Sequence, residues 1–255
     1  MNDNLSTQFS KEYGVLPTRS IAVTDDEMAL SEHIEEFSQR LIFCLILLSF
    51  FTIACFIDIK EIVKLFQAPA DGIKFLQFSP GEYFFASVKI ALFSGLLISS
   101  PAILYQILLY TLPGLTKKER DVVLPMTIGS GILFGVGLWF SYSFLVPAAL
   151  KFFIAYGADV VEPFWSFEQY FNFVAVLIFS TGLAFQVPII QIVVGLLGII
   201  SGKAMLSSWK YVVVISTILG AVITPSTDPI TQILLSGALL ALYLSGAGIL
   251  IVLNK

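Results

Sequence analysis

The sequence contains little charge for its length. Only 13% of its 255 residues are charged, about half the share found in soluble domains, whereas 57% are hydrophobic. Residues 90–116 and 122–150 carry no charged side chain at all. This shortage excludes an ordinary soluble domain and predicts a chain embedded in a lipid bilayer, with membrane lipid as its surroundings. A nucleic-acid partner is not expected, because no basic face is left outside the apolar runs.

Cysteine and histidine are also scarce. Cys44 and Cys55 would lie about 16 Å apart along one helix, which is too far for a disulfide. His33 is the only histidine, so neither a metal site nor a nucleophile–base–orienter set can be assembled around it. Phosphate-loop and dinucleotide-binding signatures are absent. We therefore expect no metal, no cofactor and no enzymatic activity.

The uncharged runs predict an all-α integral membrane protein, since about 20 apolar residues cross the hydrocarbon as a helix. We expect six transmembrane helices in one domain, residues 31–255, after a polar and disordered N-terminal tail, residues 1–30. The predicted spans are residues 41–57, 88–112, 122–150, 170–200, 211–223 and 230–253. Helices five and six are expected to be short and to form a tight hairpin, the fifth reaching only about 20 Å.

Local signals predict where helices begin and bend. Three segments have the capping-box spacing, and an Asp-Pro pair precedes the sixth span: Ser79 to Glu82 with Pro80 first in the helix, Thr116 to Glu119, Ser166 to Gln169, and Asp228-Pro229. Prolines within or beside the apolar runs should kink the helices and make the bundle concave: Pro101, Pro125, Pro147 and Pro188. The 30-residue loop over residues 58–87 is expected to fold onto the membrane surface.

The cations predict the orientation of the chain. If the N-terminus stays inside, nine cations lie on that side and five on the other, which favours both termini inside. The inner set is Lys11, Arg19, Arg40, Lys117, Lys118, Arg120, Lys203, Lys210 and Lys255, and the outer set is Lys60, Lys64, Lys74, Lys89 and Lys151. The acidic start of the chain fits neither a transit peptide nor a secretory signal.

A few polar residues near the spans are candidates for function, and each also has a structural explanation. Glu36 either forms an i,i+4 ion pair with Arg40 or binds a partner. Glu119 either caps a helix or binds a partner. Two carboxylates on one membrane face could together bind guanidinium groups. Lys89 either reaches the outer surface or acts functionally, and Gln186 either satisfies a carbonyl near Pro188 or contacts a partner helix.

Four segments resemble the TatC family, the multi-spanning receptor subunit of the twin-arginine protein translocase. They are "HIEEFSQRL", "SSPAILYQILLYTLPGLTKKER", "FSTGLAFQVPIIQ" and "ITPSTDPITQ", and they occur in the family's order. The phrases "LTKKER", "FQVP" and "TPSTDP" are most similar to the plastid and cyanobacterial branch. The resemblance implies a six-helix, glove-like bundle in the thylakoid membrane of a plastid or in a cyanobacterial or bacterial inner membrane, with both termini on the stromal or cytoplasmic side.

The resemblance also implies a function and its residues. The family binds twin-arginine signal peptides of folded precursors and recruits single-span partners of the TatA and TatB type, or their plastid counterparts, for export driven by the proton gradient. The receptor is expected to contain several copies of the chain. The residues matching the family's signal-peptide site are Glu36, Glu119, Arg40, Tyr110, Leu115 and Lys117. Those matching its other positions of interest are Pro69, Lys89 and Gln186.

Two positions depart from the bacterial pattern. Ser38 stands where bacterial members often have a basic residue, and Gln186 stands where many have a glutamate. An amide cannot carry a proton, so any role of Gln186 must be hydrogen bonding. A small-solute secondary transporter is the alternative function, and a purely structural scaffold is a third, but the sequence shows neither a repeat nor an ionisable residue in mid-span.

Overall fold

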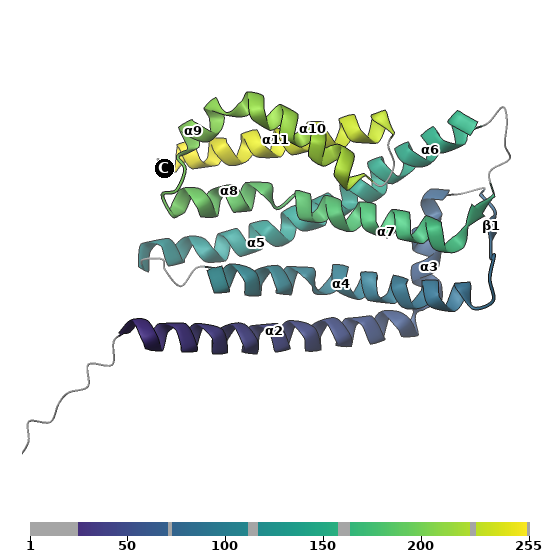
Figure 1. Cartoon of the computed structure of the whole chain (residues 1–255), viewed down its shortest axis with the longest axis horizontal. Coiled ribbons are helices and arrows are strands. Elements are labelled where there is room, and N and C mark those ends of the chain that lie inside the picture. Colours follow the sequence, from purple (N-terminus) through teal and green to yellow (C-terminus); the bar gives the residue numbers. More distant parts are fainter. Residues whose placement is uncertain (1–24, 71–72, 112–116, 158–163, 225–227, 254–255) are drawn as a thin grey trace, which may run out of the picture. The chain divides into compact units, whose positions relative to one another are not determined.

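The computed structural model describes residues 25–70, 73–111, 117–157, 164–224 and 228–253, with side chains described outside 25–33, 111 and 117–124. The chain divides into two units, residues 1–41 and residues 42–255. Helix α2 (Asp25–Ile57) is a continuous helix that begins in the first unit and ends in the second (Figure 1).

The described part of the second unit is helical apart from two strands of two residues each. In chain order its elements are α3 (Ile59–Gln67), the 3-10 helix η1 (Ala68–Ala70), β1 (Phe75–Leu76), α4 (Glu82–Thr111), α5 (Lys117–Phe140), the π-helix η2 (Ser141–Leu145), α6 (Val146–Gly157), β2 (Trp165–Ser166), α7 (Phe167–Ala184), α8 (Val187–Leu196), α9 (Gly202–Ser207), α10 (Trp209–Ile223) and α11 (Pro229–Val252).

Five helical segments of the described residues are long and apolar enough to cross a membrane. They are Ile34–Ile57, Glu82–Tyr110, Pro125–Gly157, Phe167–Leu196 and Pro229–Val252. The predicted short fifth helix is present as α10, which has 15 residues. The prediction that the sixth helix is also short is wrong, because α11 has 24 residues. Asp228 and Pro229 start this helix, and nothing in the apolar sequence that follows interrupts it before Val252.

Helix α7 forms the centre of the hydrophobic core in the second unit. It packs against α4 and α5, and α11 packs against α8 and α10 (Figure 1). Val174 and Leu177 of α7 have no exposed surface, and neither do Leu145 of η2 and Leu235 of α11. One side of the bundle therefore holds a dense apolar core, whereas α10 exposes most of its large side chains.

The described residues of the loop predicted to lie on the membrane surface are folded against the bundle, and α3 is their main element. Val63 and Phe66 of α3 are buried in the core. Tyr142 donates a hydrogen bond to the Leu65 carbonyl oxygen (2.8 Å), and Tyr170 donates one to that of Phe66 (2.7 Å). These bonds hold α3 across one end of the bundle, where β1 pairs in parallel with β2 (Figure 1). We call this the α3 end.

Most of the predicted helix starts that fall on described side chains are confirmed. The Ser166 hydroxyl accepts from the Gln169 amide, and Asp228 caps α11 by accepting from the amides of Ile230 and Thr231. The prediction that Pro80 begins a helix is wrong. Gly81 has a φ of +85°, which is incompatible with a right-handed helix, so α4 starts only at Glu82.

The prolines act in different ways. The break between α7 and α8 falls at residues 185–186, just before Pro188, as a kink there predicts. Pro147 is the second residue of α6, which follows the π-helix. Helices α4 and α5 continue through Pro101 and Pro125 respectively. The sequence carried no signal for the π-helix.

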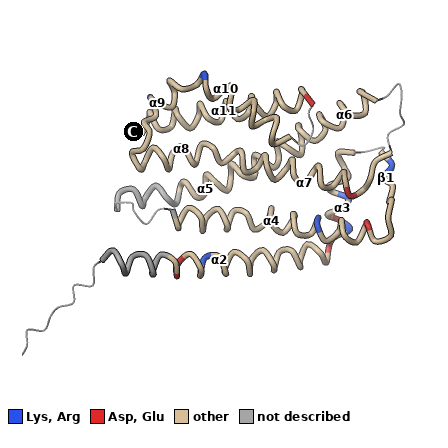
Figure 2. The backbone as a smooth tube through the Cα atoms, in the orientation of Figure 1, with Lys and Arg blue, Asp and Glu red and all other residues tan. Residues whose placement is uncertain are grey.

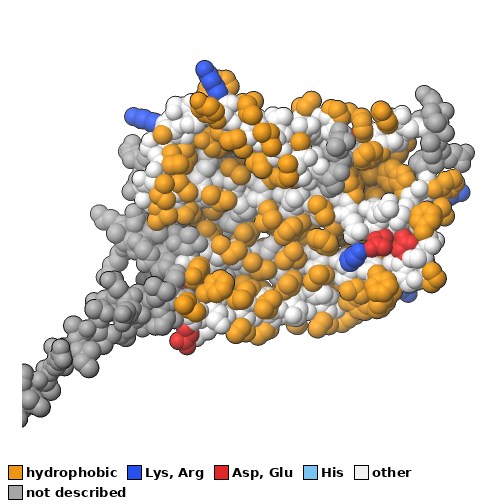
Figure 3. Space-filling model, viewed as in Figure 1, with side chains coloured by type: hydrophobic (Ala, Val, Ile, Leu, Met, Phe, Trp, Pro, Cys, Tyr) orange, Lys and Arg blue, Asp and Glu red, His pale blue; other side chains and the backbone are white. Residues whose placement is uncertain are grey.

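Charged side chains are concentrated away from the middle of the helices. The tube in Figure 2 shows most of the described charges of the second unit near the α3 end, and Figure 3 shows hydrophobic side chains over much of the remaining surface. Such an apolar belt is expected of helices that face lipid.

Candidate functional site

In the first unit, Glu36 and Arg40 form the ion pair predicted from their spacing. Nε and Nη2 of Arg40 donate to Oε1 of Glu36 at 3.0 and 2.5 Å. The Glu36 side chain is 39% exposed and that of Arg40 is 24% exposed. The Glu36 carboxylate therefore already binds a guanidinium group at a position that solvent reaches.

The remaining predicted signal-peptide residues belong to the second unit. Tyr110 is partly buried near the end of α4, and Lys117 and Glu119 are in the first turn of α5, where side chains are not described. Leu115 lies outside the described residues. The end of α4 and the start of α5 lie at the same end of the bundle, opposite the α3 end (Figure 1). We call this the Lys117 end.

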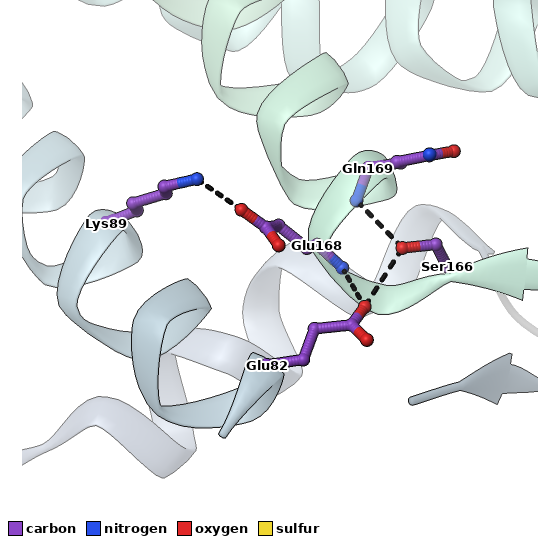
Figure 4. A network of polar contacts seen from close by, with 5 residues as sticks. All are labelled: Glu82, Lys89, Ser166, Glu168 and Gln169. Atoms are coloured by element: carbon purple, nitrogen blue, oxygen red, sulfur yellow. Dashed lines mark hydrogen bonds and ion pairs between the residues drawn. The ribbon is translucent and has the colours of Figure 1, made fainter. Parts of the chain in front are cut away.

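The α3 end contains a polar network centred on Glu82 (Figure 4). Glu82 is only 5% exposed, yet its carboxylate accepts four hydrogen bonds. The donors are the amides of Phe78 (2.6 Å), Ser79 (3.2 Å) and Glu168 (3.3 Å) and the hydroxyl of Ser166 (3.0 Å). A buried carboxylate is stable only with such partners. Glu82 therefore joins the turn before α4 to the start of α7.

Lys89 lies beside this network and forms an ion pair with Glu168 of α7 (Figure 4). The sequence had suggested only that Lys89 reaches the outer surface or has a functional role. Its partner is 79 residues away, so only the packing of α4 against α7 identifies it. Sequence reasoning missed Glu82 and Glu168 as members of this site, although the capping-box spacing had identified the position of Glu82.

Gln186 lies inside the bundle and is bonded within the chain. It is 6% exposed, its Oε1 accepts from the Ser130 hydroxyl (2.6 Å), and its Nε2 donates to the Ser130 carbonyl oxygen (3.2 Å). Gln186 thus bonds to α5 of its own chain, and the contact with a partner helix stays a prediction. Pro69 is in η1, next to α6.

Two helices at one side of the unit form a surface groove that is mostly apolar but has four polar side chains in its lining. The cavity between α10 and α11 has a volume of about 400 Å³ and includes Ser216, Thr217, Gln232 and Ser236. Gln232 donates to the Thr217 carbonyl oxygen (3.3 Å), and Ser236 donates to that of Ser216 (3.1 Å). No group of three or more metal-ligating side chains occurs among the described residues.

Comparisons with known proteins agree on one family. The family "TatC: Sec-independent protein translocase protein (TatC)" matches residues 32–237. The Sec-independent protein translocase protein TatC of Synechocystis is 53% identical over 91% of this chain and 92% of its own length. The chloroplastic TATC of Pisum sativum is 49% identical over 91% of this chain and 66% of its own length.

A solved structure has the same fold. The crystal structure of a twin arginine translocase receptor, TatC, aligns with a TM-score of 0.74 and 31% identity over 88% of this chain and all of that one. The present chain has chloroplastic and cyanobacterial relatives and several apolar helices. These identify it as a multi-pass protein of a plastid thylakoid membrane or a bacterial inner membrane. The chain belongs to the TatC family of Sec-independent protein translocase proteins.

Proposed function

We propose that this chain is the receptor and assembly core of a twin-arginine protein translocase. In this proposal it binds the twin-arginine signal peptides of folded precursors, and Glu36 and Glu119 bind the two arginines. The observation that carries the proposal is the contact between Glu36 and Arg40, in which two guanidinium nitrogens donate to one carboxylate oxygen. Hydrogen bonds to charged groups contribute about 1.5–3 kcal/mol each, so two carboxylates provide substantial affinity.

The other residues of the motif have supporting roles. Arg40 orients the Glu36 carboxylate until an incoming arginine replaces or joins it. Tyr110, Leu115 and Lys117 come from the end of α4 and the segment leading into α5, so they flank Glu119 in the chain. In this proposal Glu119 also caps α5, and the two functions are compatible because a carboxylate has two oxygens.

The proposed topology has six spans with both termini on the stromal or cytoplasmic side. Helix α10 is the additional span, although at 15 residues it is about 22 Å long and shorter than the hydrocarbon core. The glove-like shape of the family and a receptor with several copies of the chain belong to the same proposal. The N-terminal tail of this proposal is shorter than the predicted residues 1–30, because α2 already begins at Asp25.

The groove between α10 and α11 is the proposed contact for single-span partners of the TatA and TatB type. Polar groups at a lipid-facing surface favour a partner helix that offers hydrogen bonds in return. Gln186 is buried and bonded twice to Ser130, whereas Gln232 and Ser236, which also donate to carbonyl oxygens of α10, are partly exposed and within reach of a partner. Pro69 and Lys89 lie near the α3 end, and in this proposal they hold the folded loop, residues 58–87, on the outer side of the bundle.

The proton gradient across the membrane drives transport in this proposal, and the chain itself catalyses no reaction. A nucleotide-binding signature is absent from the sequence, which fits an external energy source. Membership of a protein translocase family favours this function over the small-solute transporter. Gln186, bonded to Ser130, supplies no ionisable group for coupled transport.

Photocrosslinking of a twin-arginine signal peptide to membranes tests the receptor proposal. We expect Glu36→Gln together with Glu119→Gln to abolish crosslinking. Glu61→Gln is the matched control, because Glu61 is an exposed acid on α3 that bonds only locally to Lys64. Undiminished crosslinking in the double variant would refute the assignment.

A cavity-filling substitution tests the partner groove. Gly237 lines the groove, and a Cβ there meets no atom within 4 Å, so Gly237→Leu should fill the space without disturbing α11. Co-purification of single-span partners should fall. Gly248→Leu on the same helix, also without neighbours, should leave it unchanged. Equal partner recovery from both variants would contradict the proposal.

A further inference from the structure

A cavity at the α3 end lies beside the Glu82 network and is not used by the proposed receptor function. It has a volume of about 310 Å³ and is formed by the end of α6, by β2 and by the start of α7. Its lining consists mainly of five aromatic side chains and one amide: Phe153, Phe164, Trp165, Tyr170, Phe173 and Gln169. No described residue of this lining carries a charge. The volume is at the lower end of the range found for small-molecule sites.

The position of the cavity along the helices matches the level of lipid headgroups. Phe153 lies close to the end of the candidate span Pro125–Gly157, and Gln169 lies close to the start of the candidate span Phe167–Leu196. Where such spans end, the hydrocarbon of a bilayer gives way to its polar headgroup region. Aromatic side chains are common at this level in membrane proteins. Here they also enclose a hollow, which a belt of aromatic residues does not require.

The aromatic walls of the cavity are held in place by contacts within the chain. Tyr170 is buried, and its hydroxyl donates to the Phe66 carbonyl oxygen (2.7 Å). Trp165 belongs to β2, which pairs with β1, and its ring centroid lies 6.2 Å from that of Tyr170. The rings of Phe153 and Phe173 meet edge to face with their centroids 6.1 Å apart. A ligand would therefore meet preformed walls, which lowers the entropic cost of binding.

Two polar side chains of the lining are available to a ligand. The Gln169 side chain is exposed, and it is directed away from Glu82 (Figure 4). Within the described part of the chain, neither its amide nor the indole N–H of Trp165 has a hydrogen-bond partner. Ser166, in contrast, already donates to Glu82 and accepts from the Gln169 backbone amide. The cavity thus offers donors from both side chains and an acceptor from the amide, all of them uncharged.

We infer that this cavity binds the uncharged, hydroxyl-bearing headgroup of a membrane glycolipid, such as a hexose. The C–H groups of a sugar ring pack on aromatic rings, whose faces are negative, and its hydroxyls donate and accept as the Gln169 amide does. A phosphate headgroup would need a cation, and Lys89, the cation beside the Glu82 network, is paired with Glu168. A quaternary ammonium headgroup suits aromatic faces but leaves the Gln169 amide unused. Because the lining comes from α6, β2 and α7, a bound headgroup joins the ends of two spans.

Native mass spectrometry of the full-length protein, purified in a detergent without a sugar headgroup, tests the inference. The protein should retain monogalactosyl diacylglycerol about two- to tenfold better than phosphatidylcholine with the same acyl chains, the gain expected from one hydrogen bond between neutral groups. Gln169→Leu should remove most of this preference. Gln77→Leu should keep it, because Gln77 is an exposed glutamine of the same end that lies outside the cavity and donates locally to the Ser79 carbonyl oxygen. Equal or stronger retention of phosphatidylcholine, or equal preference in the two variants, would overturn the inference.

A galactolipid that carries a photoreactive group on its sugar gives a second measurement, which needs no substitution. Adducts on Phe164, Trp165 or Phe173 would support the inference, and adducts found only elsewhere would overturn it. Methyl galactoside at the same concentration should not compete with the lipid, because it lacks the apolar acyl chains that add to binding. Equal competition would assign the cavity to a free sugar and overturn the lipid headgroup as its ligand. Neither measurement involves a signal peptide, so the receptor proposal is tested separately.

Discussion

The two ends of residues 42–255 are held together in different ways. At the α3 end, polar groups bond between elements that are far apart in the chain, with Glu82 bonded to Ser166 and Glu168, and Tyr170 bonded to Phe66. At the Lys117 end, the described residues form an apolar cavity, and the bonds between helices include those of Gln191 to Tyr243 and to the Met205 sulfur, and that of Tyr243 to the Met205 carbonyl oxygen. The α3 end also has a cavity, of about 310 Å³ and lined in part by Ser166 and Gln169, so the two ends differ in the chemistry of their contacts and not in whether space is present.

This difference agrees with the proposed functions of the two ends, in which the Lys117 end binds peptides and the α3 end keeps the helices in place. Buried hydrogen-bond networks fix one arrangement, because each lost bond leaves a desolvated group without a partner. Apolar contacts tolerate rearrangement, since they have no direction. A receptor that accepts many peptides benefits from an adaptable end, and it needs a fixed end to keep its helices in register.

The largest effect is expected from Glu82→Ala. The substitution leaves the amides of Phe78, Ser79 and Glu168 and the Ser166 hydroxyl without their acceptor, so the α3 end should open. We expect a fall of several degrees in the midpoint of thermal unfolding in detergent. Glu61→Ala, which removes an exposed acid from the same end, should change it little. Equal midpoints would show that the α3 end does not depend on this network.

A smaller effect is expected in the middle of the bundle from Ser130→Ala. The variant loses the hydroxyl bond to Gln186, and bonds of this kind between membrane helices contribute about 0.6–1.7 kcal/mol. Ser180→Ala is the control, because the Ser180 hydroxyl bonds only to carbonyl oxygens of its own helix. Thermal unfolding should separate the two variants. If both behave alike, the bond between α5 and α8 adds nothing measurable.

The smallest effect is expected from the Lys89–Glu168 ion pair. Both side chains are partly exposed, and such pairs contribute about 0.2–1 kcal/mol. A double-mutant cycle with Lys89→Ala and Glu168→Ala should give a coupling in this range that decreases with added salt. The exchange Lys89→Glu with Glu168→Lys should restore most of the stability. A coupling free energy of zero at low salt would show that this ion pair does not stabilise the protein.

Much of the helical framework could be predicted because lipid imposes strict rules on sequence. Charge-free runs marked the spans, Asp228 marked the start of α11, and Pro188 marked the break between α7 and α8. The helix starts differ most where polar residues continue a span, as in α2, which begins at Asp25 rather than at the edge of the apolar run. A helix can continue through polar residues beyond the membrane, so the apolar run marks the span and not the ends of the helix.

The contacts between helices could not be predicted in the same way. Lys89 and Gln186 were identified as polar residues of interest, but their partners are 79 and 56 residues away. Residue type and spacing describe one helix at a time, whereas these bonds depend on how α4 packs on α7 and how α5 packs on α8. The π-helix at Ser141–Leu145 likewise has no local signal in the residue types.

The most direct test of the receptor proposal is a double-mutant cycle between the protein and its peptide. The affinity of purified protein is measured for a twin-arginine peptide and for one with both arginines replaced by glutamine, with unsubstituted protein and with Glu36→Gln plus Glu119→Gln. We predict a coupling free energy of at least about 1.5 kcal/mol, or roughly tenfold in affinity, since paired charges at an interface couple this strongly. The account would be contradicted if the binding free energies lost by the peptide change and by the protein change were additive, because the arginines and the two carboxylates would then act independently.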